Sequence, residues 1–329
     1  MLFRSVTKEI ELLFQLLYAH MVDPGYRENA YHLSIKRLEQ TYKALSSSID
    51  GAMRLSGRRF LAGGDSRFGL PLFDELQKLT IEDIRSWIEG PLKHGRFEVS
   101  IVGDFDIDLV IETASRFLGS LPNRKGPEQS KRSDIPRFPV AQSLKIDVPT
   151  KINKGIVIIA YPSEDLWDIK RSRRLSVLAE IFSDRLRETI REKLGAVYSA
   201  FAFNSPKRAY PDYGVFYSMA YIDPEQAALI ETQIKKIASD ISKSGVTQEE
   251  LMRALNPTLT SIKEMLGKNS YWLHTVLSQS RLHPQQLQWS RTILKDYSSI
   301  STDEVASLAK KYLDNSKAAT IVIKPANKK

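Results

Sequence analysis

The chain has 329 residues, 42% of them hydrophobic, which suffices for two domains with buried cores and excludes a disordered or fibrous protein. The net charge is +9, but 39 acidic residues are interleaved with 48 basic ones, so nucleic-acid binding is a weak hypothesis. The absence of cysteine excludes disulfides and thiolate chemistry, and no apolar run reaches the roughly 18 residues of a membrane span.

The first part of the sequence predicts helices followed by one strand. We expect helices over Glu9–Met21 and Glu28–Met53. A third helix is expected to begin at Thr80, because Thr80-Ile-Glu-Asp83 has the sequence of a capping box. An apolar run around Ile101–Val102 predicts a strand after that helix.

The second part begins after a stretch rich in proline, lysine, arginine and serine, and we interpret residues 126–142 as a linker. We then expect a strand over Gly155–Tyr161 and a helix from Ile169 to about Lys193. The aromatic-rich runs Val197–Phe203 and Val215–Tyr221 predict an antiparallel hairpin.

Four basic residues lie near the start of the predicted Ile169 helix, and they form the densest positive cluster of the sequence (Lys170, Arg171, Arg173 and Arg174). No aromatic residues are interleaved with them, as they would be on a surface that stacks nucleic-acid bases. We therefore expect this cluster to be a solvated helix face.

Two segments have matching patterns at a constant offset of 221 residues, from Thr80 and from Ser301. Each begins with a capping box and continues into an apolar run, although chance is an alternative because such units are common. If the repeat is real, the first copy lacks the counterpart of residues 146–221. We therefore predict an α+β fold of two homologous domains, each an antiparallel sheet packed with helices: residues 1–125, truncated at the N-terminus, and residues 143–329, complete.

Several motifs resemble the pitrilysin/insulinase family of zinc metallopeptidases, the inverzincins. Asp65–Pro71, Ser100–Asp106 and Leu121-Pro-x-Arg124 resemble the third domain of bacterial members with two homologous halves, while Arg191–Tyr198 and Pro211–Phe216 resemble the fourth. The resemblance implies a fold like that of mitochondrial processing peptidase. It also implies that the chain is the C-terminal half of an endopeptidase and forms part of its peptide chamber.

The zinc site of this family is an inverted His-x-x-Glu-His motif in the first domain, and that motif is absent here. None of the five histidines lies three or four residues from another, the spacing that places two ligands on one helical face (His20, His32, His94, His274 and His283). The resemblance therefore implies that this chain binds no metal or other cofactor and is inactive alone. Its implied partners are a zinc-bearing N-terminal half of the same protein and peptide substrates, with no nucleic acid and no membrane span.

The family also implies two catalytic residues, Arg191 and Tyr198, which reach the scissile peptide in the closed chamber. A hydroxyl donor with a nearby guanidinium can stabilise the negative charge that develops on the carbonyl oxygen. The alternative is structural, with Arg191 paired to Glu188 or Glu192 on the helix and Tyr198 packed as an ordinary strand aromatic. Arg208 and Tyr213 in the hairpin loop are weaker candidates for peptide contact.

A second function stays open, because members of such families also serve as non-catalytic scaffolds or substrate-presenting paralogues. The retention of Arg191 and Tyr198 argues mildly against that alternative. The resemblance points to a bacterial protein and slightly favours the periplasm over the cytoplasm. The sequence as given contains no recognisable targeting signal.

Overall fold

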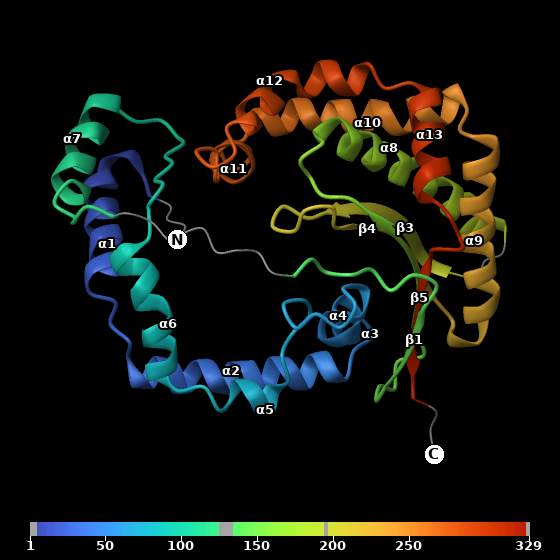
Figure 1. Cartoon of the computed structure of the whole chain (residues 1–329), viewed down its shortest axis with the longest axis horizontal. Helices are drawn as coiled ribbons and strands as arrows, with labels where there is room; N and C mark the ends of the chain where they lie inside the picture. Colours follow the sequence, from blue (N-terminus) through green and yellow to red (C-terminus); the bar gives the residue numbers. More distant parts are fainter. Residues whose placement is uncertain (1–4, 125–133, 194–196, 327–329) are drawn as a thin grey trace. The chain divides into compact units, whose positions relative to one another are not determined.

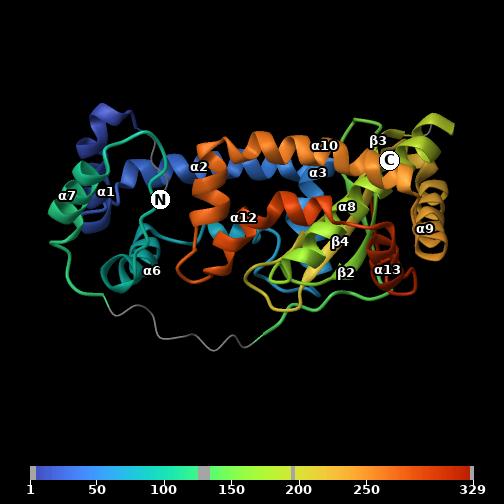
Figure 2. The ribbon, with the colours of Figure 1, turned by 90° about the horizontal axis from the view of Figure 1, so that it is seen from above.

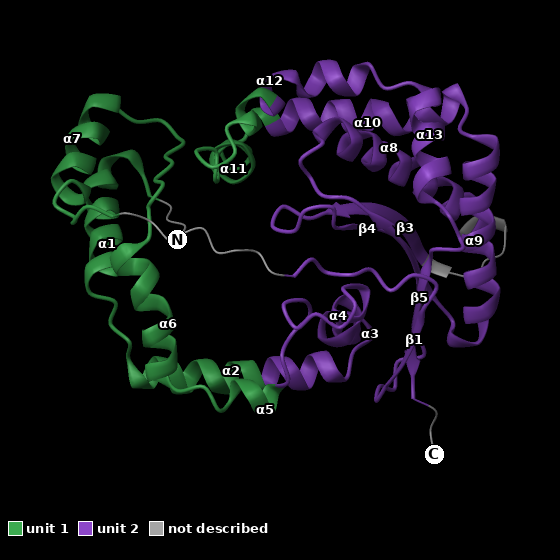
Figure 3. Cartoon of the chain, viewed as in Figure 1, with its two compact units in different colours: residues 1–39, 73–132, 266–288 green, residues 40–72, 133–265, 289–329 purple. Residues whose placement is uncertain are grey.

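The computed structural model describes residues 5–124, 134–193 and 197–326, except for the side chains of residues 191–198. The chain forms two compact units (Figure 3). Unit 1 comprises residues 1–39, 73–132 and 266–288, and unit 2 comprises residues 40–72, 133–265 and 289–329. Most of the buried hydrophobic residues lie in unit 2.

Unit 2 is built on a five-stranded sheet with the order β1-β5-β2-β4-β3 (Figure 1). Its strands are β1 (Ser143–Val148), β2 (Gly155–Ser163), β3 (Val197–Pro206), β4 (Gly214–Ile222) and β5 (Ala319–Pro325). The β1–β5 pair is parallel and the other pairs are antiparallel. The predicted strand over Gly155–Tyr161 and the predicted hairpin are confirmed, as is the α+β fold class.

Long helices cover one face of this sheet: α8 (Ile169–Leu186), α9 (Ala227–Ser244) and α13 (Thr302–Tyr312). Helix α13 lies beside α8 and α9 (Figure 1; Figure 2). The core on this side contains fully buried side chains from helices and strands, including Leu178, Phe182, Phe216, Ile234 and Val305. Helix α10 (Gln248–Leu266) contributes Leu251 and Leu255 to the same core.

The other face of the sheet is only partly covered. The short helices α3 (Ile49–Ala52) and α4 (Arg58–Leu61), joined by the π-helix η2 (Met53–Gly57), pack over β1, β5 and β2. Beyond them, Phe201 and Phe203 of β3 remain 37% and 38% exposed. The β3–β4 part of this face is therefore open.

The basic cluster at the start of α8 is not the solvated face that we expected. Arg173 and Arg174 are only 5% and 8% exposed. Asp296 accepts a hydrogen bond from each guanidinium, at 2.8 Å and 2.9 Å, and Glu304 accepts a third from Arg174. The expectation was wrong for these two arginines because the acids that pair with them lie more than 120 residues later in the chain.

A second ion pair links α8 to the start of α10. Arg185 donates to both carboxylate oxygens of Glu250, at 2.6 Å and 3.0 Å, and the Thr247 N–H donates to the same group. Burial alone would raise the pKa of Glu250, but these hydrogen bonds outweigh it and lower the pKa to about 2. The Glu250 carboxylate therefore stabilises unit 2 most above pH 4.5, the ordinary pKa of a glutamate. This stabilisation is lost as the pH falls toward 2, the pKa of Glu250 in the folded protein.

We expect Glu250→Gln to lower the free energy of unfolding by about 2 kcal/mol at pH 6, a typical value for a hydrogen-bonded charged pair. The deficit should shrink as both proteins are acidified toward pH 2, because the wild-type carboxylate then becomes neutral. Urea unfolding of both proteins between pH 6 and pH 2.5 measures this difference. A deficit that does not change with pH would contradict the assignment of this stabilisation to the ionised Glu250 carboxylate.

Unit 1 is largely helical, with α1 (Ile10–Val22), the first part of α2 (Glu28–Ser46), α6 (Ile81–His94) and α7 (Ile107–Leu118). Other short helical segments in the described ranges are η1 (Thr7–Glu9), α5 (Phe73–Leu76), η4 (Pro224–Gln226), α11 (Asn269–Tyr271) and η5 (Trp272–Leu277). Helix α12 spans Gln285–Ser298. Capping boxes begin α6 at Thr80 and α13 at Ser301, as predicted.

The strand predicted around Ile101–Val102 does not form, and residues 95–106 are neither helix nor strand. A strand needs a neighbouring strand for its backbone hydrogen bonds, and unit 1 has no strand in the part of it that the structure describes. Phe97 and Val99 remain exposed in this segment.

Candidate functional site

The two predicted catalytic residues lie at either end of one connection in unit 2. The backbone of Arg191 belongs to the π-helix η3 (Arg187–Lys193), which continues α8, and that of Tyr198 belongs to the start of β3. Their side chains, and residues 194–196 between them, lie outside the described residues. Their catalytic roles therefore stay predictions.

Both backbone positions are irregular. A π-helix is uncommon, and single turns of it occur frequently at functional sites. Tyr198 falls in a β-bulge, because Val197 pairs with Ile222 while Ser199 already pairs with Tyr221. A bulge changes the direction of a side chain and is over-represented next to active sites. The sequence spacing did not reveal either irregularity.

The neighbouring charges bear on the structural alternative for Arg191. Glu188, one of its two candidate partners, lies 3.2 Å from the Arg253 guanidinium of α10. Asp184 lies near the same guanidinium and accepts a hydrogen bond from Arg187. Glu188 and Asp184 thus pair with Arg253 and Arg187, while the side chains of Arg191 and Glu192 lie outside the described residues, so the structural alternative for Arg191 stays open.

The two weaker candidates lie in the β3–β4 loop and differ in their accessibility. Tyr213 is 4% exposed, and its hydroxyl donates to the Leu61 carbonyl at 3.0 Å. Burial also raises the pKa of the Tyr213 hydroxyl. Because the side chain is buried and its hydroxyl is already bonded, Tyr213 packs within the protein. The Arg208 guanidinium forms no hydrogen bond with any residue that the structure describes, and of the two it alone is free for a ligand.

The outer edge of β3 is blocked at its centre. The Ala202 N–H donates to the Ser183 hydroxyl of α8 at 2.8 Å, and that hydroxyl lies 3.3 Å from the Ala202 carbonyl. A side chain thus occupies the backbone groups that an added strand would use. Peptide binding by strand addition at this point of β3 is therefore disfavoured, and the open face of the hairpin is the accessible surface.

Sequence reasoning missed this open face, which we call the aromatic face and define by Phe201, Phe203, Tyr217, Met219 and Tyr221. The rings of Phe203 and Tyr217 stack with centroids 4.7 Å apart, and those of Phe201 and Phe203 lie 6.1 Å apart. The alternation of large apolar residues along both strands was a visible signal. It could not show which part of the sheet face the helices α3 and α4 leave open.

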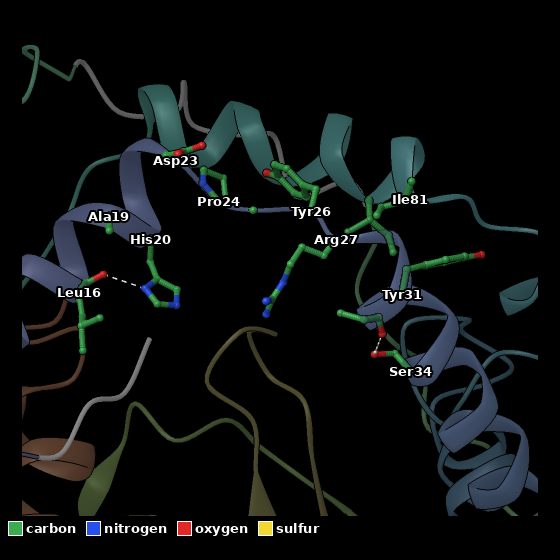
Figure 4. A pocket seen from close by; sticks show the side chains of 13 residues that line it. Leu16, Ala19, His20, Asp23, Pro24, Tyr26, Arg27, Tyr31, Ser34 and Ile81 are labelled. Carbon is green, nitrogen blue, oxygen red and sulfur yellow. Dashed lines mark hydrogen bonds between the residues drawn. The ribbon is translucent and has the colours of Figure 1, made fainter.

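Unit 1 carries an open depression of about 630 Å³ beside α1, the start of α2 and α6 (Figure 4). Three of its polar side chains are engaged locally: His20 Nδ1 lies 2.7 Å from the Leu16 carbonyl, Tyr31 donates to the Leu79 carbonyl and Ser34 donates to the Ala30 carbonyl. Across the described ranges, no group of three or more histidine, aspartate or glutamate side chains could hold a metal ion. Nothing in this depression indicates catalysis.

Comparison with known families identifies the chain. Residues 78–257, more than half of it, match the model described as "Peptidase M16 inactive domain". The chain belongs to the M16 peptidase family. This confirms the resemblance to the pitrilysin/insulinase metallopeptidases, and the matched model is that of the domain without the zinc site.

Curated relatives of this M16 chain include peptidases and a non-peptidase. An uncharacterized zinc protease of Rickettsia felis is 27% identical over 201 residues, which are 58% of this chain and 45% of the relative. The chloroplastic stromal processing peptidase of Oryza sativa is 22% identical, over 79% of this chain and 24% of the relative. The non-peptidase homolog YmxG of Helicobacter pylori is 23% identical, over 73% and 55%. The chain thus spans less than half of the first two relatives.

Solved structures share the fold of this M16 chain. The M16 inactive domain from Pseudomonas fluorescens superposes with a TM-score of 0.82 at 16% identity, covering 98% of this chain and 76% of that one. At this identity the likeness shows the fold alone. No helix among residues 5–124, 134–193 and 197–326 is long and apolar enough to cross a membrane, and the periplasmic preference stays a prediction.

Proposed function

We propose that this chain is the non-zinc half of a zinc metalloendopeptidase and that Arg191 and Tyr198 act on the scissile carbonyl in the assembled enzyme. The observation that carries this proposal is the placement of both residues on backbone irregularities, a π-helix and a β-bulge, at the two ends of one connection. Such irregularities are retained where a side chain must be aimed at a reaction centre.

The chemistry is divided between the two halves of the enzyme. Zinc, when bound by the other half, would activate a water for attack on the peptide carbonyl. The Tyr198 hydroxyl donates a hydrogen bond to the carbonyl oxygen as negative charge develops on it, and the Arg191 guanidinium stabilises the same charge. Arg208, with no described partner, contacts the peptide outside the scissile bond.

The proposal includes the domain division 1–125 and 143–329, with the first domain incomplete. The compact units cross this boundary, because residues 40–72 belong to unit 2 and residues 266–288 to unit 1. Two observations support the incomplete first domain. The two large hydrophobic clusters lie in unit 2, while most of the exposed large hydrophobic residues, Trp87 at 80% among them, lie in unit 1. In addition, Val305 and Ala309 of α13 are fully buried in the core beneath the sheet, whereas their repeat counterparts in α6, Ile84 and Ile88, have no described strand to cover them.

The test is cleavage of an internally quenched peptide by this chain, alone and mixed with its zinc-bearing partner half. We expect no cleavage by the chain alone and zinc-dependent cleavage, abolished by a chelator, in the mixture. Zinc-dependent cleavage by the chain alone would overturn the proposal, because it would require a metal site in this polypeptide.

The alternative is a non-catalytic scaffold or substrate-presenting paralogue, which the match to a non-peptidase homolog favours. This alternative predicts that the mixture binds the quenched peptide without cleaving it. Peptide binding measured beside cleavage in the same mixture separates the two functions.

A further inference from the structure

We propose that the aromatic face of unit 2 binds an extended peptide segment, with one acidic side chain held by Arg58 and Lys207 and an apolar side chain lying on Phe201 and Phe203. This inference rests on the proposed function, since it names the peptide class that this wall of the chamber prefers.

The apolar part of the surface is preorganised. Phe201 and Phe203 are more than a third exposed, yet each is held in a stacked arrangement, and Phe203 rests on the 8%-exposed ring of Tyr217. Rigid aromatic side chains supply contact area at a small cost in conformational entropy. A bulky side chain of a ligand can therefore bind here without rearrangement of the sheet.

One end of the aromatic face is positively charged. Ser205 follows Phe203 on the same side of β3, and Lys207 Nζ donates to the Ser205 hydroxyl at 3.1 Å. Arg58 begins α4, whose Leu61 packs in the same hydrophobic cluster as Tyr217, and the Arg58 charge acts to lower the pKa of both Lys207 and Tyr217. Burial and the neighbouring Arg58 lower the pKa of Lys207, and Lys207 forms no ion pair with any residue that the structure describes. Arg58 itself forms no ion pair with a described residue.

Two neighbouring cations that form no ion pair within the described part of the chain favour an anionic ligand group, which would relieve their repulsion. At the opposite end of the aromatic face, the charged side chains already interact with another residue of the chain. The Tyr221 hydroxyl donates to Asp50, and Lys154 lies 4.3 Å from the centre of the Tyr221 ring. The ligand's acid is therefore expected at the Lys207 end.

The spacing along β3 defines the peptide further. Alternate residues of an extended chain lie about 7 Å apart on one side. A ligand that lies along β3 presents its acidic side chain at Ser205 and Lys207 and its apolar side chain at Phe203 when the two are two residues apart. The preferred segment is thus Glu-x-Phe or Phe-x-Glu in an extended conformation.

The test uses a fluorescein-labelled peptide that contains Glu-x-Phe and its Glu→Gln counterpart, with affinity to this chain measured by fluorescence anisotropy. We expect the acidic peptide to bind at least tenfold more tightly. We expect Arg58→Ala and Lys207→Gln each to remove most of that preference, and Phe203→Ala to weaken both peptides. Lys154→Ala, at the other end of the face, is the matched control and should leave the preference unchanged.

Equal affinities of the two peptides for the wild-type chain would overturn the inference, as would loss of the preference in Lys154→Ala alone. Thermal unfolding of each variant verifies that the chain remains folded. The binding measurement uses this chain without the zinc-bearing half. A failure of the binding preference can therefore be told apart from a failure of the cleavage test.

Discussion

Replacement of Tyr198 by phenylalanine is expected to lower the turnover of the reassembled peptidase by about 10²-fold or more and to leave KM nearly unchanged. The variant loses one hydroxyl that stabilises charge only in the transition state, and substrate affinity does not depend on it. The kinetic constants of the mixture of both halves, measured with a quenched peptide, separate the two effects. Arg191→Lys keeps the charge but loses the planar fork of donors, and a smaller fall in turnover is expected.

Tyr18→Phe is the matched control, because it removes a hydroxyl from α1 for which no hydrogen bond to a described residue exists. Its turnover should equal that of the wild type. If Tyr198→Phe also retained full turnover, Tyr198 would be an ordinary strand aromatic and the transition-state role would be withdrawn. A rise in KM at constant turnover would instead assign Tyr198 to substrate binding.

Removal of the Asp296 carboxylate is expected to cause a large loss of stability. Asp296 is 8% exposed and accepts hydrogen bonds from two buried arginines, so Asp296→Ala leaves two guanidinium groups without their shared partner. Breaking a buried pair in this way costs about 3–5 kcal/mol. The urea unfolding transition of Asp296→Ala at neutral pH should shift accordingly.

Asp303→Ala provides the control for a lost negative charge, since Asp303 is exposed in the first turn of α13. Its expected cost is about 0.5 kcal/mol, from the interaction with the helix dipole alone. Comparable destabilisation by the two substitutions would mean that the arginines find other partners and that Asp296 is not the centre of the network.

The features that the sequence predicted correctly depend on neighbouring residues. The capping boxes at Thr80 and Ser301 and the β3–β4 hairpin are set by contacts within a few residues or across one short loop. The burial of Arg173 and the order of the sheet depend on segments far along the chain and could not be predicted. The strand prediction at Ile101–Val102 was wrong for a related reason. The apolar pattern is typical of a strand, but no described strand lies beside it to pair with.

The candidate site likewise has features that the sequence shows and features that only the folded chain shows. The spacing of Arg191 and Tyr198 was visible in the sequence, whereas the π-helix and the bulge that carry them are properties of the folded backbone. Lys207 and Arg58 are separated by 149 positions and were not considered together. Only the packing of α4 against the sheet brings Arg58 near the end of β3.

The position of β5 has a consequence for the synthesis of the protein. This strand separates β1 from β2 in the sheet, yet it begins almost a hundred residues after the end of β4. While the ribosome adds those residues, β2 can pair with β4 on one side only, and its other edge, with Ile156–Ile159, stays open. Such an edge can recruit other nascent chains, and distant pairing is slow. The growing polypeptide is thus most vulnerable to aggregation in this interval, and it is then that we expect chaperones to bind it.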